Sequence, residues 1–338
     1  MRFQFIIILF LWTICLGQFG NDQSITKTGT TVAQFLKIGM DARSTSMGGA
    51  VAGQNGNLSG VYWNPASIAS YNGIGVQFGS YDWLVAMKYQ FAIIGIDLGA
   101  KGVLGLSIVN LSSPDDLVRT VSEPQGTGEK FSTNDLSASL TYSKMLTDHF
   151  SLGGSFKYIQ QNIWHSTAHT VAIDIGTLFQ TPFYGTRLGA SISNYGGKMK
   201  MDGRDQKISI DPDLDNQGNV EFVNAIYETE HFPLPLFFRV GVSGELIKKQ
   251  NLKLSYGIDA LHPNDNTEHL NLGLELNYRE ILFLRCGIPS FYKMDSVEGP
   301  TFGAGLNYHM TRTATLLKID YSFSSFGPLG DIERLSIG

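Results

Sequence analysis

The sequence predicts an all-β protein: a transmembrane antiparallel β-barrel of about fourteen strands, with a short N-terminal plug that contains helical turns. Three observations support this prediction. Apolar and polar residues alternate with a period of two along most of the chain. Most connections between the alternating segments are short and long in turn, although the first, around Trp83–Lys88, is short and breaks the trend. Glycine is abundant, with 38 residues against 11 prolines, as expected for a curved sheet.

A secretory signal peptide is expected at residues 1–17. Arg2 precedes an apolar run from Phe5 to Leu16, which is too short to predict a spanning helix. After cleavage, Cys286 is the only cysteine left, so an intrachain disulfide is excluded. The net charge of −5 and the lack of a basic run argue against nucleic acid as a partner.

Residues 18–72 do not alternate and are predicted to form a plug, or hatch, inside the barrel. Gly48 and Gly49 allow close backbone approach. Asn64-Pro65 is a turn signal, and Pro65 is suited to open a short helix. A barrel of about fourteen strands has an open lumen that would hold such a segment. The alternative is a periplasmic arm without lumen contacts.

Residues 73–338 are predicted to form the barrel. The alternation is clearest where Leu270, Leu272, Leu274, Leu276 and Tyr278 face one way and polar residues the other. The other strong segments are 136–143, 151–158, 171–180, 187–193, 238–246, 252–259, 302–308 and 317–323, and the weaker ones are 74–81, 89–98, 103–110, 281–289 and 332–338. One face of each suits lipid and the other suits water or a polar plug.

The lengths of the connections predict the orientation. Tight turns are expected at 99–101, 147–149, 181–184, 248–250, near 280 and at 310–312, and longer loops at 111–133, 161–168, 195–235, 262–268 and 290–300. Outer-membrane barrels have short turns in the periplasm and long loops outside. A soluble sandwich has no reason to show this alternation. We therefore expect the outer membrane of a Gram-negative bacterium, with outer-membrane lipid as a partner.

The predicted inward face carries charges of both signs. They are Lys157, Asp174, Arg239, Glu245, Glu275, Arg279, Lys318 and Asp320. Mixed signs argue against a charge-selective pore, because selective filters use rings of one sign. The favoured interpretation is a plug or wet lumen held by ion pairs, and the alternative is a polar conduit.

The longest predicted loop, 195–235, is the best candidate for contact with a partner. It contains the apolar residues Met199, Met201, Phe222, Tyr227 and Phe232 among many acids. A lid folded over the barrel mouth is the alternative.

No catalytic motif is apparent, and we predict neither an enzyme nor a cofactor. The sequence has no nucleophile elbow, phosphate loop or nucleotide fingerprint. His165 and His169 lack the glutamate of a zinc motif. The run from Asp211 lacks the glycine and glutamate of a calcium loop, so no metal site is predicted.

The segment before the barrel resembles the N-terminal signature of the PorV/PorQ family of outer-membrane proteins, which are relatives of the FadL-type barrels. The resemblance lies in residues 35–50 and in the run Tyr62-Trp63-Asn64-Pro65-Ala66. The hatch residues that carry it are Gly39, Ala42, Arg43, Met47, Gly48, Gly49, Tyr62, Trp63, Asn64, Pro65 and Ala66.

The resemblance implies a fourteen-stranded barrel plugged by a hatch with an Asn-Pro-Ala turn. It also implies a role in protein secretion or surface display of the type IX kind, in which exported proteins or other secretion components bind at the extracellular mouth. The alternative function is a FadL-like passage for hydrophobic small molecules. A purely structural barrel is the third possibility.

Overall fold

The computed structural model describes residues 27–338 except 184, 213–214, 216–221, 294–295 and 311–314. The predicted signal peptide, residues 1–17, and the first part of the predicted plug, residues 18–26, lie outside the described residues. No helix in the described part is long and apolar enough to cross a membrane.

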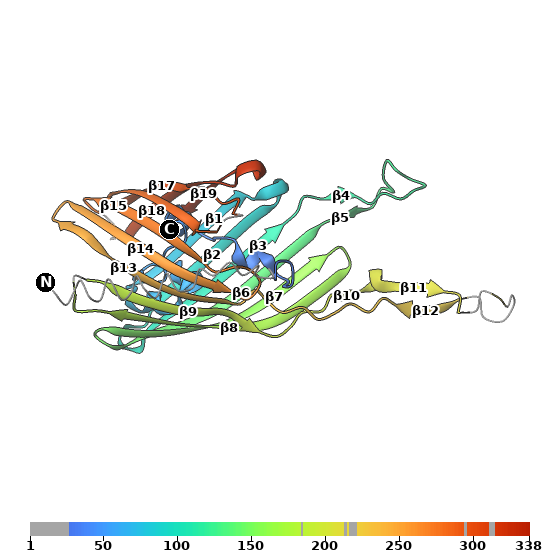
Figure 1. Cartoon of the computed structure of the whole chain (residues 1–338), viewed down its shortest axis with the longest axis horizontal. Coiled ribbons are helices and arrows are strands. Elements are labelled where there is room, and N and C mark those ends of the chain that lie inside the picture. The colour runs from blue at the N-terminus through green and yellow to red at the C-terminus, as the bar shows by residue number, and fades with distance from the viewer. Residues whose placement is uncertain (1–26, 184, 213–214, 216–221, 294–295, 311–314) are drawn as a thin grey trace.

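Fourteen strands of the described chain form one closed antiparallel barrel (Figure 1). They are β1 (Ile74–Asp82), β2 (Lys88–Asp97), β3 (Val103–Ser112), β6 (Thr133–Thr147), β7 (Phe150–Ile163), β8 (Ser166–Gln180), β9 (Arg187–Gly196), β13 (Phe237–Lys249), β14 (Leu252–Pro263), β15 (His269–Tyr278), β16 (Leu282–Phe291), β17 (Thr301–Met310), β18 (Thr315–Ser325) and β19 (Asp331–Ile337). Consecutive strands pair, and β1 closes the ring on β19 through Phe78↔Ile337 and Gly79↔Ser336. The predicted fold class is confirmed.

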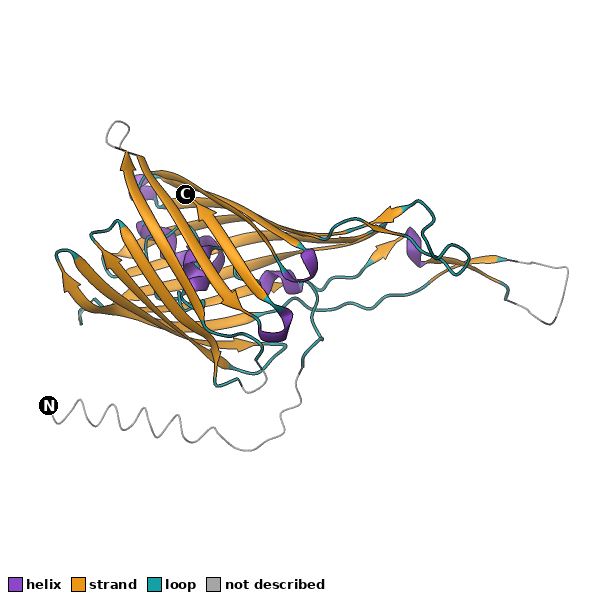
Figure 2. Ribbon diagram, turned by 90° about the horizontal axis from the view of Figure 1, so that it is seen from above, coloured by secondary structure: helices purple, strands orange, loops and turns teal. Residues whose placement is uncertain are grey.

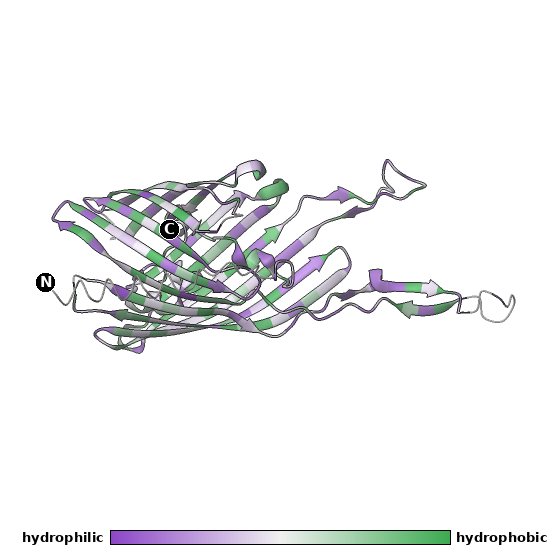
Figure 3. Ribbon diagram, in the orientation of Figure 1, coloured by the Kyte–Doolittle hydropathy of each residue, from purple (hydrophilic) through white to green (hydrophobic). Residues whose placement is uncertain are grey.

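The alternation of side chains follows the prediction. In β7, Leu152 and Phe156 are 42% and 54% exposed on the outer face, whereas Ser155 and Lys157 are buried. Figure 3 shows green and purple residues in turn along the strands. Apolar side chains on the outside and polar ones within are the arrangement that a lipid-embedded barrel with a filled lumen requires.

The two ends of the barrel differ, and we call them the loop end and the turn end. Two arms project from the loop end (Figures 1 and 2). One holds β4 (Asp116–Leu117) and β5 (Lys130–Phe131). The other holds β10 (Asp202–Gly203), η5 (Arg204–Gln206), β11 (Lys207–Ile210) and β12 (Val223–Ile226). The short elements η3 (Leu84–Ala86) and η6 (Gly327–Leu329) also lie at this end, and η4 (Gly99–Lys101) lies at the turn end.

The segment from residue 31 to 70 lies inside the ring of strands (Figure 2). It contains η1 (Gln34–Lys37), α2 (Ala42–Ser46), α3 (Gly60–Trp63) and η2 (Pro65–Ser70). Asp41 caps α2 by accepting a hydrogen bond from the Ser44 N–H. The expected helix behind Asn64 is η2, in which Pro65 takes the first position and the Asn64 side chain accepts from the Ala66 N–H.

Two predictions about side-chain position were wrong. Arg279 does not face the lumen, because β15 ends at Tyr278 and Arg279 lies exposed in the turn, with φ of 54°. A residue with positive φ belongs to the tight turn, so the alternation of the strand ends at Tyr278. Met199 is not an exposed contact residue. It is 1% exposed in the apolar core, and Met201 packs against the same core.

The described residues of the loop 195–235 do not fold over the mouth as a lid. Its base pairs with itself through Met199↔Phe232, and its outer half runs away from the barrel as the β11–β12 ribbon (Figures 1 and 2).

Candidate functional site

The loop end of the barrel opens into a cavity of about 860 Å³. Apolar side chains from the plug and the rim dominate its lining, among them Phe35, Leu36, Trp83, Leu84, Phe237 and Phe326. Its floor is the plug itself, including Tyr62 and Trp63. A concave, mostly apolar site of this size with a few polar groups is typical of small-molecule binding.

Three of the cations that line the cavity, Lys37, Lys157 and Arg239, pair with the protein's own carboxylates. Lys157 lies 2.6 Å from Asp174 and donates to Asn194 Oδ1 at 3.0 Å. Arg239 lies 4.8 Å above the Trp63 ring. Its Nη1 is 3.7 Å from an Asp259 oxygen. These pairs leave an apolar cavity without a strong net charge, which suits an uncharged hydrophobic guest.

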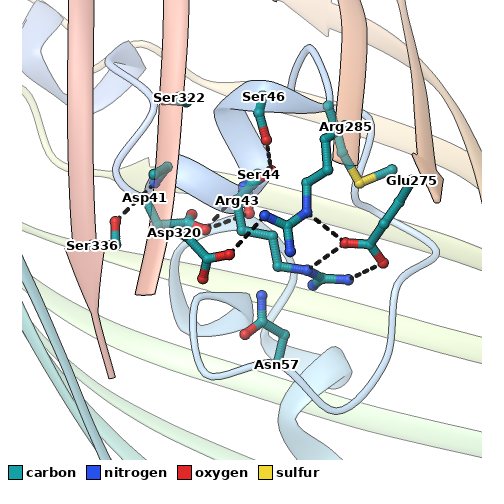
Figure 4. A network of polar contacts seen from close by, with 12 residues as sticks. Asp41, Arg43, Ser44, Ser46, Asn57, Glu275, Arg285, Asp320, Ser322 and Ser336 are labelled. Atoms are coloured by element: carbon teal, nitrogen blue, oxygen red, sulfur yellow. Dashed lines mark hydrogen bonds and ion pairs between the residues drawn. The ribbon is translucent and has the colours of Figure 1, made fainter. Parts of the chain in front are cut away.

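A chain of four charges, of which Glu275, Arg285 and Asp320 are buried and Arg43 is partly buried, joins the plug to the wall (Figure 4). Arg43 of α2 binds Glu275 of β15 bidentately, with both N···O distances 3.0 Å. Arg285 of β16 donates to Glu275 at 2.7 Å and to Asp320 of β18 at 2.6 Å. The four charges sum to zero, and bidentate guanidinium–carboxylate geometry is the strong form of this interaction.

Arg285 reaches Asp320 across the intervening strand β17. This crossing is possible because β17 presents Gly303 and Gly305 to the lumen, and a Cβ at Gly305 would lie within 3 Å of both Arg285 and Asp320. The sequence prediction contained Glu275 and Asp320 but missed Arg285, which lies directly opposite Glu275 in the strand register.

A second carboxylate of the wall, Asp259, binds the plug at residues 51 and 52. Asp259 Oδ2 accepts hydrogen bonds from the backbone N–H groups of Val51 and Ala52, both at 2.9 Å. Arg239, beside Asp259, donates to the Gly49 carbonyl at 3.1 Å. One wall ion pair therefore binds two donors and one acceptor of the plug backbone, in addition to the hydrogen bonds within the plug, such as that from the Val51 N–H to the Gly49 carbonyl at 3.1 Å.

Inward-facing glycines of the wall form a girdle on which the plug lies. A Cβ added at Gly153, Gly189, Gly257, Gly273 or Gly287 would lie within 3 Å of plug backbone atoms. At Gly95, Gly105 and Gly176 it would meet plug side chains at similar range. Glycine is needed here because only a residue without Cβ permits this backbone approach. These glycines therefore bring the plug into close contact with the wall at several strands of the barrel.

The plug residues 31–37 are bound by a single carboxylate, Asp265, in the loop between β14 and β15. Asp265 is 1% exposed and accepts hydrogen bonds from Thr31, Gln34 and Lys37, with Lys37 Nζ at 2.7 Å. Burial raises the pKa of this carboxyl, but the hydrogen bonds from Lys37, Thr31 and Gln34 outweigh it and leave the pKa of Asp265 below its usual range. We call this cluster the latch.

The latch gives a pH-dependent prediction. Because the folded-state pKa of Asp265 is depressed, its contribution is present above the unfolded pKa of about 4 and is lost as pH falls through the folded value. Asp265→Asn is expected to lower amide-exchange protection of residues 31–37 at neutral pH by about 1.5–3 kcal/mol, the net value of hydrogen bonds to a charged group. Glu268→Gln, at an exposed carboxylate that pairs with His262, is the control and should leave protection unchanged. Equal protection in both variants would contradict the role of the latch.

The remaining predicted hatch residues all lie in the plug. Tyr62 Oη is 2.7 Å from the carbonyl oxygens of Leu36 and Ile38, and burial raises the pKa of Tyr62. Trp63 donates to Asp41 at 2.9 Å. Asn64 donates to the Ala52 carbonyl at 2.7 Å. Gly39, Ala42, Met47, Gly48, Gly49, Pro65 and Ala66 supply close packing and backbone contacts.

Two predicted lumen charges stay outside these clusters. Glu245 is half-buried and pairs with Lys248 at 3.0 Å near the turn end, and Lys318 is half-buried on the face of Asp320. Within the described residues, no group of three or more His, Cys, Asp or Glu side chains is placed to hold a metal ion.

Comparison with known proteins finds solved structures with a similar fold and low sequence identity. No family model matches the sequence, and no curated protein matches it. The Pseudomonas putida toluene transporter TodX is 13% identical, with a TM-score of 0.53 over 88% of this chain and 96% of that chain. The CymD monoaromatic hydrocarbon channel is 12% identical, with a TM-score of 0.52 over 88% and 96%. A Pseudomonas aeruginosa FadL homologue is 11% identical, with a TM-score of 0.48 over 88% and 97%. At these identities, TodX and CymD show a shared barrel fold.

Proposed function

We propose that this protein is an outer-membrane barrel that takes up hydrophobic small molecules through the cavity at its loop end. The supporting observation is that mostly apolar cavity, in which Lys37, Lys157 and Arg239 of the lining are paired with carboxylates of the protein. TodX is a toluene transporter and CymD is a monoaromatic hydrocarbon channel, and both functions agree with this proposal. An apolar guest would gain by leaving water, at about 25 cal/mol per Å² of buried apolar surface.

The test uses two neighbouring phenylalanines on opposite faces of β13. Phe237 lines the cavity, and Phe238 is 45% exposed on the outer face. Phe237→Ser is expected to weaken the binding of toluene to the purified protein about tenfold, or about 1.4 kcal/mol. Phe238→Ser, the matched control, should leave this affinity unchanged. Toluene titration followed by tryptophan fluorescence, which reports on Trp63 and Trp83 in the lining, measures both. Equal affinity in the two variants would contradict the proposal.

The secretion role that the PorV/PorQ resemblance implies stays a prediction, because the comparisons give it no support. Absence of enzyme activity likewise stays a prediction. The observation that favours a protein partner is the arm of residues 195–235, which small-molecule uptake does not require.

A further inference from the structure

The β11–β12 ribbon at the end of the longer arm has one continuous apolar face. The register pairs Ile208 with Ala225 and Ile210 with Val223, so these four side chains share a face. Ile210 and Val223 are 44% and 43% exposed. An isolated two-stranded ribbon is marginally stable in water, and both of its outer edges have backbone groups available for a further strand. The ribbon therefore has the geometry of a surface that is completed by another strand.

The base of the arm is fixed, so that the ribbon has a defined place. His165 lies 3.0 Å from Asp205 and 2.6 Å from Arg204, and Arg204 lies 3.7 Å from Glu129 of the other arm. Met199 and Phe232 exchange backbone hydrogen bonds, both at 2.9 Å. These contacts tie the ribbon to the barrel and to the second arm, whereas the ribbon itself extends beyond both (Figure 1).

The negative charge of the arm indicates which class of partner it would attract. Residues 208–230 contain six acids and no lysine or arginine, whereas the whole chain has a net charge of −5. The rest of the chain therefore sums to about +1, and the negative charge is concentrated on this arm. The acids among the described residues are Asp211, Asp215, Glu228 and Glu230, and the other two lie outside the described residues. A second copy of the arm or an anionic membrane surface would be repelled, and a cationic surface would be attracted.

We propose that the β11–β12 ribbon binds a cationic protein segment in extended conformation, which adds a strand at a ribbon edge and places apolar side chains against Ile208, Ile210, Val223 and Ala225. Main-chain hydrogen bonds supply the affinity in this mode, and alternate side chains supply the specificity. Lysine or arginine on the other face of the segment meets the acids of the arm. This inference is independent of small-molecule uptake.

The experiment uses the full-length barrel in detergent and a synthetic peptide of alternating lysine and valine, with a glutamate–valine peptide as the charge control. The wild-type protein is expected to bind the lysine peptide and not the glutamate peptide. Ile210→Ser with Val223→Ser should weaken this binding at least about tenfold, and Asn224→Ala, on the opposite face, should not change it. Glu228→Gln with Glu230→Gln should weaken binding severalfold without altering the apolar face, and so should added salt.

Three results would overturn the proposal. Equal binding of both peptides would exclude charge selection. Equal binding by the wild type and the Ile210/Val223 double variant would exclude the apolar face. Dimers in analytical ultracentrifugation that disappear in the double variant would show that a second copy of the chain is the occupant. Heat-modifiable mobility on gels verifies that each variant retains its barrel.

Discussion

Glu275→Ala is expected to lower the free energy of unfolding of the barrel by about 3–5 kcal/mol, the range measured when one partner of a buried ion pair is removed. Glu275 is 7% exposed and is the centre of the chain Arg43–Glu275–Arg285–Asp320. Its removal leaves two guanidinium groups close together, with Asp320 as the remaining carboxylate of the chain. Because Arg43 belongs to the plug, the plug should also lose its strongest contact with this part of the wall.

Urea unfolding in detergent micelles, with refolding to verify equilibrium, measures this loss. Glu245→Ala is the control, since Glu245 is half-buried and pairs with a Lys248 side chain that is 71% exposed. Its expected cost is within about 1 kcal/mol, as for surface pairs. If Glu275→Ala cost no more than Glu245→Ala, the four-charge chain would contribute little to stability.

Gly153→Val is expected to force the plug away from the wall and to open a conducting path through the lumen. A Cβ at Gly153 would lie within 3 Å of backbone atoms of Pro65 and Ala66, which cannot rotate aside as a flexible side chain could. Overpacking of this kind costs typically about 1–3 kcal/mol, and more where backbone must move. The wild-type barrel, with its plug seated on the glycine girdle, should show little ion conductance.

The neighbouring glycine supplies the matched control. Gly154 faces outward, and a Cβ there meets only the Asp174 carbonyl oxygen, at 3.6 Å, which is ordinary contact. Gly154→Val should therefore leave stability and conductance unchanged or slightly improve the strand. Single-channel recording in planar bilayers compares the two variants with the wild type. Equal, low conductance in all three proteins would show that the girdle does not hold the plug closed.

Much of the barrel could be read from local pattern. The alternation at residues 270–278 defines β15, because one face must meet lipid and the other the lumen, and a strand has no other way to separate them. The helical turn after Asn64 follows from the fixed φ of Pro65 and the capping oxygen of Asn64. Arg279 was misplaced because the pattern does not reveal the residue at which a strand gives way to a tight turn.

The candidate sites depended on neighbours that are distant in sequence. Asp265 resembles any loop acid until Thr31, Gln34 and Lys37 are brought to it from more than 200 positions away. The sequence analysis missed Arg285 because its role in the ion-pair chain depends on two features of the folded barrel. The strand register places it opposite Glu275, and the glycines of β17 leave space for it to reach Asp320. Met199 looked like an exposed contact because its burial comes from the plug and rim around it.

The sequence by itself determined a barrel with an apolar outside and a polar inside, since period-two alternation is a property of each strand alone. Only the tertiary structure decided which inward charges form ion pairs, which glycines contact the plug, and where the apolar cavity and the acidic ribbon lie. These features are set by closure of the ring and by strand register, which place residues from separate strands at one height, and no local stretch of sequence contains that information.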